Sequence, residues 1–172
     1  MMNEKVNKAF NEQMNREFYS AYLYLGMSEW LSRNAWTNSA SWMVEQYREE
    51  IAHAEGLMRW IQRCDGEVEF YAIGAVHTNY DSLLDVFEKA LAHEQFVTKS
   101  IHGLVKLTQE NEDRASELFL DWYVMEQVEE EEVARENIDN IKLAGDDRKA
   151  LIDFDKSMAG RTFTPPAIPY LE

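Results

Sequence analysis

Four stretches of the sequence each place one glutamate where the surrounding pattern calls for a hydrophobic residue. The four are Glu17, Glu50, Glu94 and Glu130. Around each of them apolar residues recur at alternating steps of three and four, the spacing of one buried face of an α-helix. The four faces comprise Phe10, Met14, Glu17, Ala21, Tyr24, Ser28 and Leu31; Met43, Tyr47, Glu50, Ala54, Leu57 and Ile61; Leu84, Phe87, Leu91, Glu94, Thr98, Ile101 and Val105; and Leu120, Tyr123, Gln127, Glu130, Ala134 and Ile141. Each glutamate lies near the middle of its face, so antiparallel packing would bring the four carboxylates to one level.

Carboxylates buried in this way need compensating groups. A single core glutamate is usually protonated or paired with a base, but none of the four faces carries Lys or Arg. Each unpaired buried ion costs several kcal/mol, against a typical stability of ~5–15 kcal/mol. A pair of divalent metal ions would remove the conflict, and His53 stands one turn from Glu50 as a nitrogen ligand. Carboxylate and imidazole without thiolate suit Fe, Mn or Zn.

Helix start and stop signals divide the chain into five predicted helices, with a long connection at residues 67–80 that lacks helical periodicity. The expected bounds are Asn3 (cap) to Arg33, a turn at 34–38, Ser39 to Asp65 with Gly66 as its stop, Asp81 (cap) to Glu110, Asn111 (cap) to Ala144 with Gly145 as its stop, and Asp146 to Ala159 before Gly160. We expect one domain over residues 1–160 and an extended or mobile proline-rich tail over residues 161–172.

The loop lengths predict the topology. Short turns after the first and third helices require antiparallel neighbours, whereas residues 67–80 can cross the whole bundle. The fold class is therefore all-α, a four-helix bundle with one long crossover and a short fifth helix. In that fifth helix Leu151, Phe154 and Met158 form an apolar stripe suited to symmetric packing between subunits.

Composition narrows the class of partners. The chain has 172 residues, with 17 Lys and Arg against 32 Asp and Glu, for a net charge of −15. This balance argues against nucleic acid as a partner and would attract cations. No apolar run approaches the ~18–20 residues of a membrane span, and the start lacks the apolar segment of a signal peptide. The lone Cys64 excludes an internal disulfide, and we expect a cytoplasmic protein.

Two segments carry a family resemblance. Residues 49–55 (Glu-Glu-Ile-Ala-His-Ala-Glu) and 126–132 (Glu-Gln-Val-Glu-Glu-Glu-Glu) resemble the non-haem bacterial ferritins, and the likeness extends through the fifth helix. The resemblance implies a ferritin-like di-iron bundle. It implies that Glu17, Glu50 and His53 hold one iron, that Glu50 bridges, and that Glu94 and Glu130 hold the second with Gln127 beside it. It also implies a third iron site at Glu49, Glu126, Glu129 and Glu130, although such exposed glutamates can equally form a solvated acidic face.

Two departures from related patterns narrow the resemblance. Related di-iron bundles carry a Glu-x-x-His motif on each of two helices. Glu50 and His53 match the first motif, but the fourth helix has Gln127-x-x-Glu130 in place of the second. This difference favours ferritin over bacterioferritin, rubrerythrin or a di-iron oxygenase. In bacterioferritin a methionine follows the bridging glutamate and gives the resemblance to a haem binder. Here Ile51 stands at that position, so no haem is implied.

The resemblance implies an iron-storage protein with ferroxidase activity. Fe(II) would be oxidised to Fe(III) with O2 or H2O2 and stored as ferric mineral inside a homo-oligomeric cage of twenty-four subunits. Tyr24 matches a redox-active tyrosine of ferritins and Trp122 resembles a neighbouring tryptophan of the bacterial members, so both could supply electrons; either could instead serve packing alone. The alternatives are a di-iron oxidase or peroxidase acting without storage, and a purely structural bundle.

Overall fold

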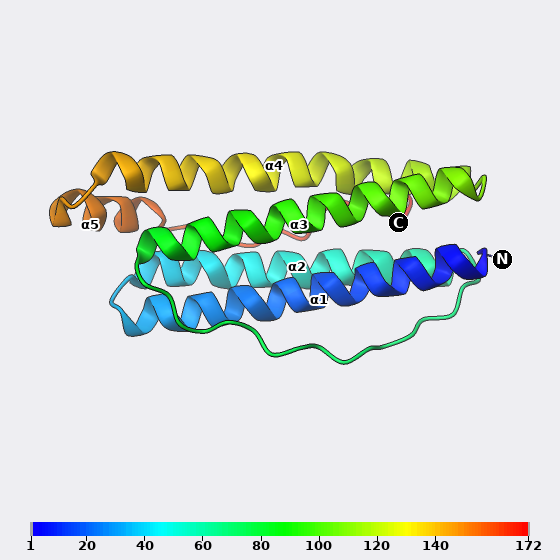
Figure 1. Cartoon of the computed structure of the whole chain (residues 1–172), viewed down its shortest axis with the longest axis horizontal. Helices are drawn as coiled ribbons and strands as arrows, with labels where there is room; N and C mark the ends of the chain where they lie inside the picture. The colour runs from blue at the N-terminus through cyan, green and yellow to red at the C-terminus, as the bar shows by residue number, and fades with distance from the viewer. Residues whose placement is uncertain (1, 172) are drawn as a thin grey trace.

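The computed structural model describes residues 2–171, and within that range the regular secondary structure is entirely α-helical. The helices are α1 (Glu4–Arg33), α2 (Thr37–Arg63), α3 (Leu83–Glu110), α4 (Arg114–Ala144) and α5 (Arg148–Ser157). Figure 1 shows α1 and α2 as one antiparallel pair and α3 and α4 as a second, with the connection between α2 and α3 running the length of the bundle. The predicted all-α bundle with one long crossover is confirmed.

The helix boundaries follow local hydrogen bonds, and some differ from prediction. Asn3 caps α1 as expected, because its Oδ1 accepts from the Lys5 N–H at 2.9 Å. The cap of α3 is Ser82 rather than Asp81, since the Ser82 hydroxyl accepts from the Asp85 N–H at 3.1 Å. The predicted cap Asp81 lies one residue outside, and its N–H donates to the Asp85 carboxylate.

The predicted cap of α4, Asn111, also lies two residues before the observed cap, Asp113. Asn111 ends α3 instead of starting α4, because its side chain donates to the Leu107 carbonyl at 2.8 Å. Glu112 then adopts a left-handed backbone with φ of 54°. Asp113 caps α4 by accepting from the Ser116 N–H at 3.1 Å.

After α2, Gly66 is needed because it has no side chain, and not because its backbone is left-handed. The left-handed residue there is Asp65, with φ of 54°, and not Gly66. A Cβ added to Gly66 would lie 2.3 Å from Asn7 Oδ1, so the glycine permits a close approach to α1. α2 accordingly ends at Arg63. Gly145 ends α4 with φ of 55°, as predicted.

The core consists of two apolar clusters. One contains Phe10, Leu57 and Phe119, and the Trp60 and Phe119 rings stack there with centroids 4.3 Å apart. The other is built around Met27 and Phe87. The four glutamates belong to neither cluster, although each is buried.

The fifth helix packs its apolar stripe on its own subunit, whereas we expected that stripe to suit symmetric packing between subunits. Phe154 and Met158 are each 8% exposed, and the Phe154 ring contacts Phe87 with centroids 5.8 Å apart. Asp155 anchors the helix by accepting hydrogen bonds from Asn38 and Ser39 at the start of α2. α5 runs from Arg148 to Ser157, two residues shorter than predicted at both ends.

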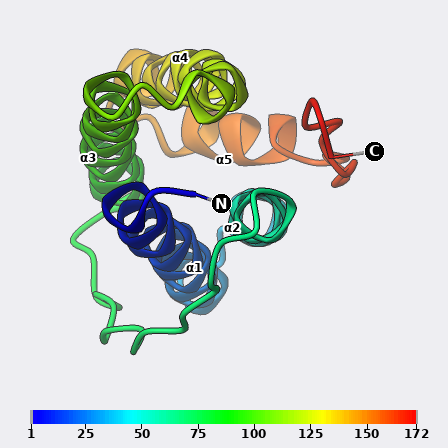
Figure 2. The same cartoon turned by 90° about the vertical axis from the view of Figure 1, so that its right-hand side faces the viewer.

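The tail after α5 is extended and packed. It turns at Gly160, with φ of 87°, and runs back along the bundle beside α2 (Figures 1 and 2). Ile168 is 8% exposed and belongs to the first core cluster. Within residues 2–171 no helix combines the length and apolarity that a membrane crossing requires.

Candidate metal centre

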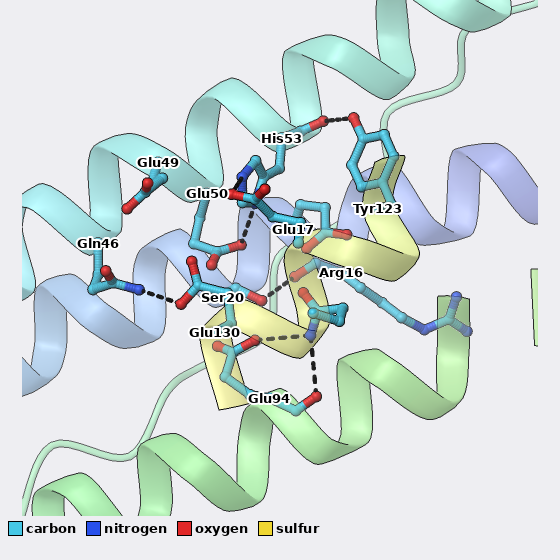
Figure 3. Close-up of polar contacts among 12 residues, drawn as sticks. Arg16, Glu17, Ser20, Gln46, Glu49, Glu50, His53, Glu94, Tyr123 and Glu130 are labelled. Carbon is cyan, nitrogen blue, oxygen red and sulfur yellow. Dashed lines mark hydrogen bonds and ion pairs between the residues drawn. The ribbon is translucent and has the colours of Figure 1, made fainter. Parts of the chain in front are cut away.

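All four long helices contribute side chains to one buried polar centre (Figure 3). α1 supplies Glu17, α2 supplies Glu50 and His53, α3 supplies Glu94, and α4 supplies Gln127 and Glu130. Each of these six side chains is at most 8% exposed. The helical periodicity read from the sequence therefore brings together every residue predicted for the two main iron positions.

One half of the centre surrounds His53. Its Nδ1 lies 3.6 Å from Glu50 Oε2, and ligand atoms of Glu17, Glu50 and His53 all lie within 4.8 Å of one another. The Nε2 atom of His53 is buried and has no hydrogen-bond partner. A buried nitrogen without a partner is costly, and it stands 3.7 Å from Glu126 Oε1. This donor set suits a divalent cation, which would bind the imidazole nitrogen that faces Glu50 and neutralise the carboxylates.

The other half surrounds Glu94 and Glu130. The Tyr24 hydroxyl donates to Glu94 Oε1, and Gln127 Nε2 donates to Glu94 Oε2 at 3.1 Å. Gln46 Nε2 donates to Glu130 Oε2 at 2.9 Å. Each carboxylate is thus oriented by neutral donors. No lysine or arginine of the described chain forms an ion pair with Glu17, Glu50, Glu94 or Glu130.

Burial shifts the proton affinity of these groups. It raises the pKa of Glu17, Glu50 and Glu94 above the ordinary value, and it raises the pKa of Glu130 to about 8. For His53 burial lowers the pKa, but the nearby carboxylates of Glu126 and Glu50 outweigh it and the net pKa is raised. The metal-free centre therefore retains protons near neutral pH, and a bound cation would displace them.

A second acidic group adjoins the first. Ligand atoms of Glu49, Glu126 and Glu130 lie within 4.8 Å of one another, so Glu130 belongs to both groups. Glu49 and Glu126 are half-buried, and burial raises the pKa of Glu49. Glu129, also predicted for this site, is exposed and the structure does not bring it into the group.

The two predicted redox residues contact the centre differently. The Tyr24 hydroxyl donates to Glu94, a member of the centre, and burial raises the pKa of Tyr24 well above the ordinary value. The half-buried Trp122 does not reach a carboxylate; its ring meets the His53 ring edge-on, with centroids 5.5 Å apart.

Several residues that support the centre through hydrogen bonds were not predicted from the sequence. Gln13 Nε2 donates to Glu17 at 2.8 Å, and the four-residue spacing of this pair is a signal that the sequence offers. Gln46 stands four residues before Glu50 but donates to Glu130 of another helix, which no local spacing indicates. The Tyr123 hydroxyl donates to the His53 carbonyl at 2.8 Å. Arg161 of the tail pairs with Glu49, a contact across 112 residues that no local pattern announces.

Comparison with known proteins gives consistent matches. A family model described as the ferritin-like domain matches residues 7–144. A bacterial non-heme ferritin of Campylobacter jejuni is 42% identical over 146 residues, covering 85% of this chain and 87% of its own. Another from Staphylococcus saprophyticus is 36% identical over 163 residues, covering 95% and 98%.

Solved structures agree with these sequence matches. An engineered closed form of Archaeoglobus fulgidus ferritin superposes with a TM-score of 0.94 at 39% identity, covering 95% of this chain and all of that one. A structure described as a novel open-pore ferritin from the same archaeon gives a TM-score of 0.93 at 38% identity, covering 94% and 100%.

Proposed function

The chain belongs to the ferritin family, as the sequence resemblance implied, and from that premise we propose that it stores iron and oxidises Fe(II) at its buried centre. The observation that carries the proposal is the convergence of four buried glutamates and His53, with no lysine or arginine paired to those glutamates in the described chain. Such a centre is under-compensated until cations arrive. Iron is here the substrate and cargo of the site.

We assign the two iron positions by the donor atoms that face each other. Glu17 and His53 bind the first Fe(II), Glu94 and Glu130 bind the second, and Glu50 bridges between them. Gln127 supports the second position; it donates to Glu94 in the metal-free arrangement and offers its remaining amide oxygen to a cation. Glu49, Glu126 and Glu130, with Glu129 at the surface, form an auxiliary third position.

The chemistry follows from these assignments. Two Fe(II) ions supply two electrons to O2 or H2O2, and the protons displaced from the raised-pKa carboxyls are available to the reduced oxygen species. We propose that Tyr24 and Trp122 donate further electrons, which their contacts with Glu94 and His53 support. Oxygen-rich ligation with a neutral Gln127 binds iron loosely enough for the oxidised ions to move on to storage.

Storage requires a container, so the chain should assemble into a hollow homo-oligomer of twenty-four subunits. Exposed apolar side chains on α1 and the crossover support an assembly, since Tyr22, Leu25, Phe70 and Ile73 are each at least 40% exposed. The net charge of −15 would draw Fe(II) toward such a particle. A cytoplasmic location fits this role and stays part of the proposal.

Removing the bridging carboxylate tests the assignment. We expect Glu50→Ala to slow the initial oxidation of Fe(II) by about 100-fold or more, because even outer supports of a metal centre are worth ~10–100-fold. Glu55→Ala is the matched control, an exposed glutamate of the same helix whose partner is Arg59. Stopped-flow absorbance after mixing with aerated buffer measures both. Near-normal oxidation by Glu50→Ala would refute the assignment.

A further inference from the structure

The C-terminal tail covers one side of the bundle. No Cα atom of α2 comes within 8 Å of one in α4, whereas α1 with α2 and α3 with α4 are closely paired. Residues 161–171 run along this more open side (Figure 2). Their course is parallel to α2, because Phe163 N–H donates to Glu45 at 2.7 Å and the Tyr170 ring lies 6.5 Å from that of Trp60.

The tail is fitted to the helices at its middle. A Cβ added to Gly56 of α2 would lie 2.5 Å from Ile168 Cδ1, so the absence of a side chain there lets Ile168 seat against the helix. The same Cβ would lie 2.5 Å from the Tyr123 hydroxyl, which donates to His53. The tail therefore packs directly behind the candidate metal centre.

The first residue of the tail places a positive charge at the auxiliary acidic group. The Arg161 guanidinium donates to the Glu49 carboxylate and to Gln46 Oε1, and it lies over the Trp42 ring at 4.5 Å. Gln46 in turn donates to Glu130 at 2.9 Å. One guanidinium thus orients two of the three carboxylates in the group of Glu49, Glu126 and Glu130, while its side chain stays 29% exposed.

We propose that Arg161 is the resident counter-cation of this group and that a third metal ion must displace it from Glu49 in order to bind. The inference rests on the proposed function and adds a regulator to it. The guanidinium and a divalent ion would both lie against the Glu49 carboxylate, where their like charges repel at close range. Docking of Arg161 on Glu49 and binding of the ion there therefore oppose each other.

Competition of this kind is reciprocal. If Arg161 weakens binding of the ion, then the ion must weaken docking of the tail by the same factor. Filling of the auxiliary site would loosen the start of the tail, whereas Ile168 keeps the rest in place. The position of Arg161 would thus report whether the auxiliary site is loaded.

Calorimetric titration of the assembled metal-free protein with Zn(II), which binds carboxylate and imidazole without redox chemistry, tests the proposal. We expect Arg161→Gln to tighten the third Zn(II) per chain by roughly tenfold, the worth of one charge-assisted hydrogen bond at a partly exposed site. Arg33→Gln, an exposed arginine paired with Glu29 at the end of α1, should have no effect.

A double substitution and a second readout make the test specific. In a Glu49→Gln background, Arg161→Gln should no longer alter the affinity for the third Zn(II). Amide hydrogen exchange near residue 161 should accelerate when wild-type protein receives its third equivalent. A third ion that binds equally or more weakly in Arg161→Gln would overturn the inference alone. Failure to bind the first two ions would overturn the proposed function as well.

Discussion

At the scale of single residues, the centre is a set of carboxyl groups that prefer protons to charge while no metal is bound. Glu130 has a pKa of about 8, and burial raises the pKa values of Glu17, Glu50 and Glu94. Because the folded-state pKa values exceed those of the unfolded chain, protonation stabilises the fold. That stability is fully present below the ordinary pKa of 4.5 and is lost as the pH rises through about 8.

The melting temperature of the metal-free protein should therefore fall as the pH is raised from about 5 to above 8. Zn(II) should reverse the fall, and its stabilising effect should grow with pH because fewer protons have to be displaced. Scanning calorimetry with and without Zn(II) measures both trends. A stabilisation by Zn(II) that did not change across this range would contradict the protonation account.

Sequence periodicity predicted the inner residues of the centre well, for a physical reason. A glutamate on an apolar helical face can only point into the core, so Glu17, Glu50, Glu94 and Glu130 were fixed by their spacing. The rim is different, because a surface glutamate can point several ways. Glu129 illustrates this: it shares the acidic run with Glu126 and Glu130 but stays exposed.

At the scale of elements, helix ends and packing contacts decide what the pattern alone could not. The caps predicted at Asp81 and Asn111 were wrong by one and two residues. The end of α2 was wrong by two residues, because Asp65 rather than Gly66 adopts the left-handed backbone. Ser82 and Asp113 form the caps because their side chains accept a hydrogen bond from the N–H three residues on. The apolar stripe of α5 was visible in its own sequence, but its packing partners were not, since Phe87 and Asn38 are distant in the chain.

Docking of α5 should depend on Asp155. Burial raises the pKa of this carboxyl, but hydrogen bonds from Ser39 and Asn38 outweigh it and the net pKa is lowered. We expect Asp155→Asn to destabilise the docked helix by ~2 kcal/mol, because an amide group would face backbone and side-chain donors. Asp153→Asn, exposed on the same helix, is the control. Hydrogen exchange over residues 148–157 should accelerate only in the first variant.

The sign of the pH effect at this contact is opposite to that of the centre. A lowered folded-state pKa contributes stability that is present above the ordinary value of 3.8 and is lost as the pH falls through the folded value. The accelerated exchange of residues 148–157 should therefore appear in wild-type protein under acid conditions. Equal exchange in wild type and Asp155→Asn at neutral pH would show that Asp155 does not dock the helix.

Seating of the tail should depend on Gly56. Alanine would normally stabilise a helix interior by ~1 kcal/mol, and Gly103→Ala should do so, because no atom lies within 4 Å of its added Cβ. Gly56→Ala should instead displace Ile168 and expose the tail to limited proteolysis. Digestion patterns and melting temperatures of the two variants measure the contrast. A tail that stayed protected in Gly56→Ala would mean that the close approach is not needed.

At the scale of the whole molecule, the fold places its chemistry in the middle and its connections outside. The long crossover joins two helical hairpins so that four glutamates from four helices meet, while the tail closes one side. The sequence predicted the bundle because loop lengths restrict its topology. It could not predict the tail contacts, since an extended segment has no period to read. The proposed assembly into a cage would rest on surfaces whose partners are other copies of the chain.

Controlled iron loading tests the central claim most directly. Metal-free protein is given Fe(II) without oxygen and then exposed to air, while absorbance is followed and particle size is measured by light scattering. We predict rapid oxidation of about two Fe(II) per chain, followed by slower uptake of many more ions in a large, unaggregated particle. Oxidation that stops at two ions per chain in a small oligomer would contradict storage and would indicate a di-iron oxidase or peroxidase instead.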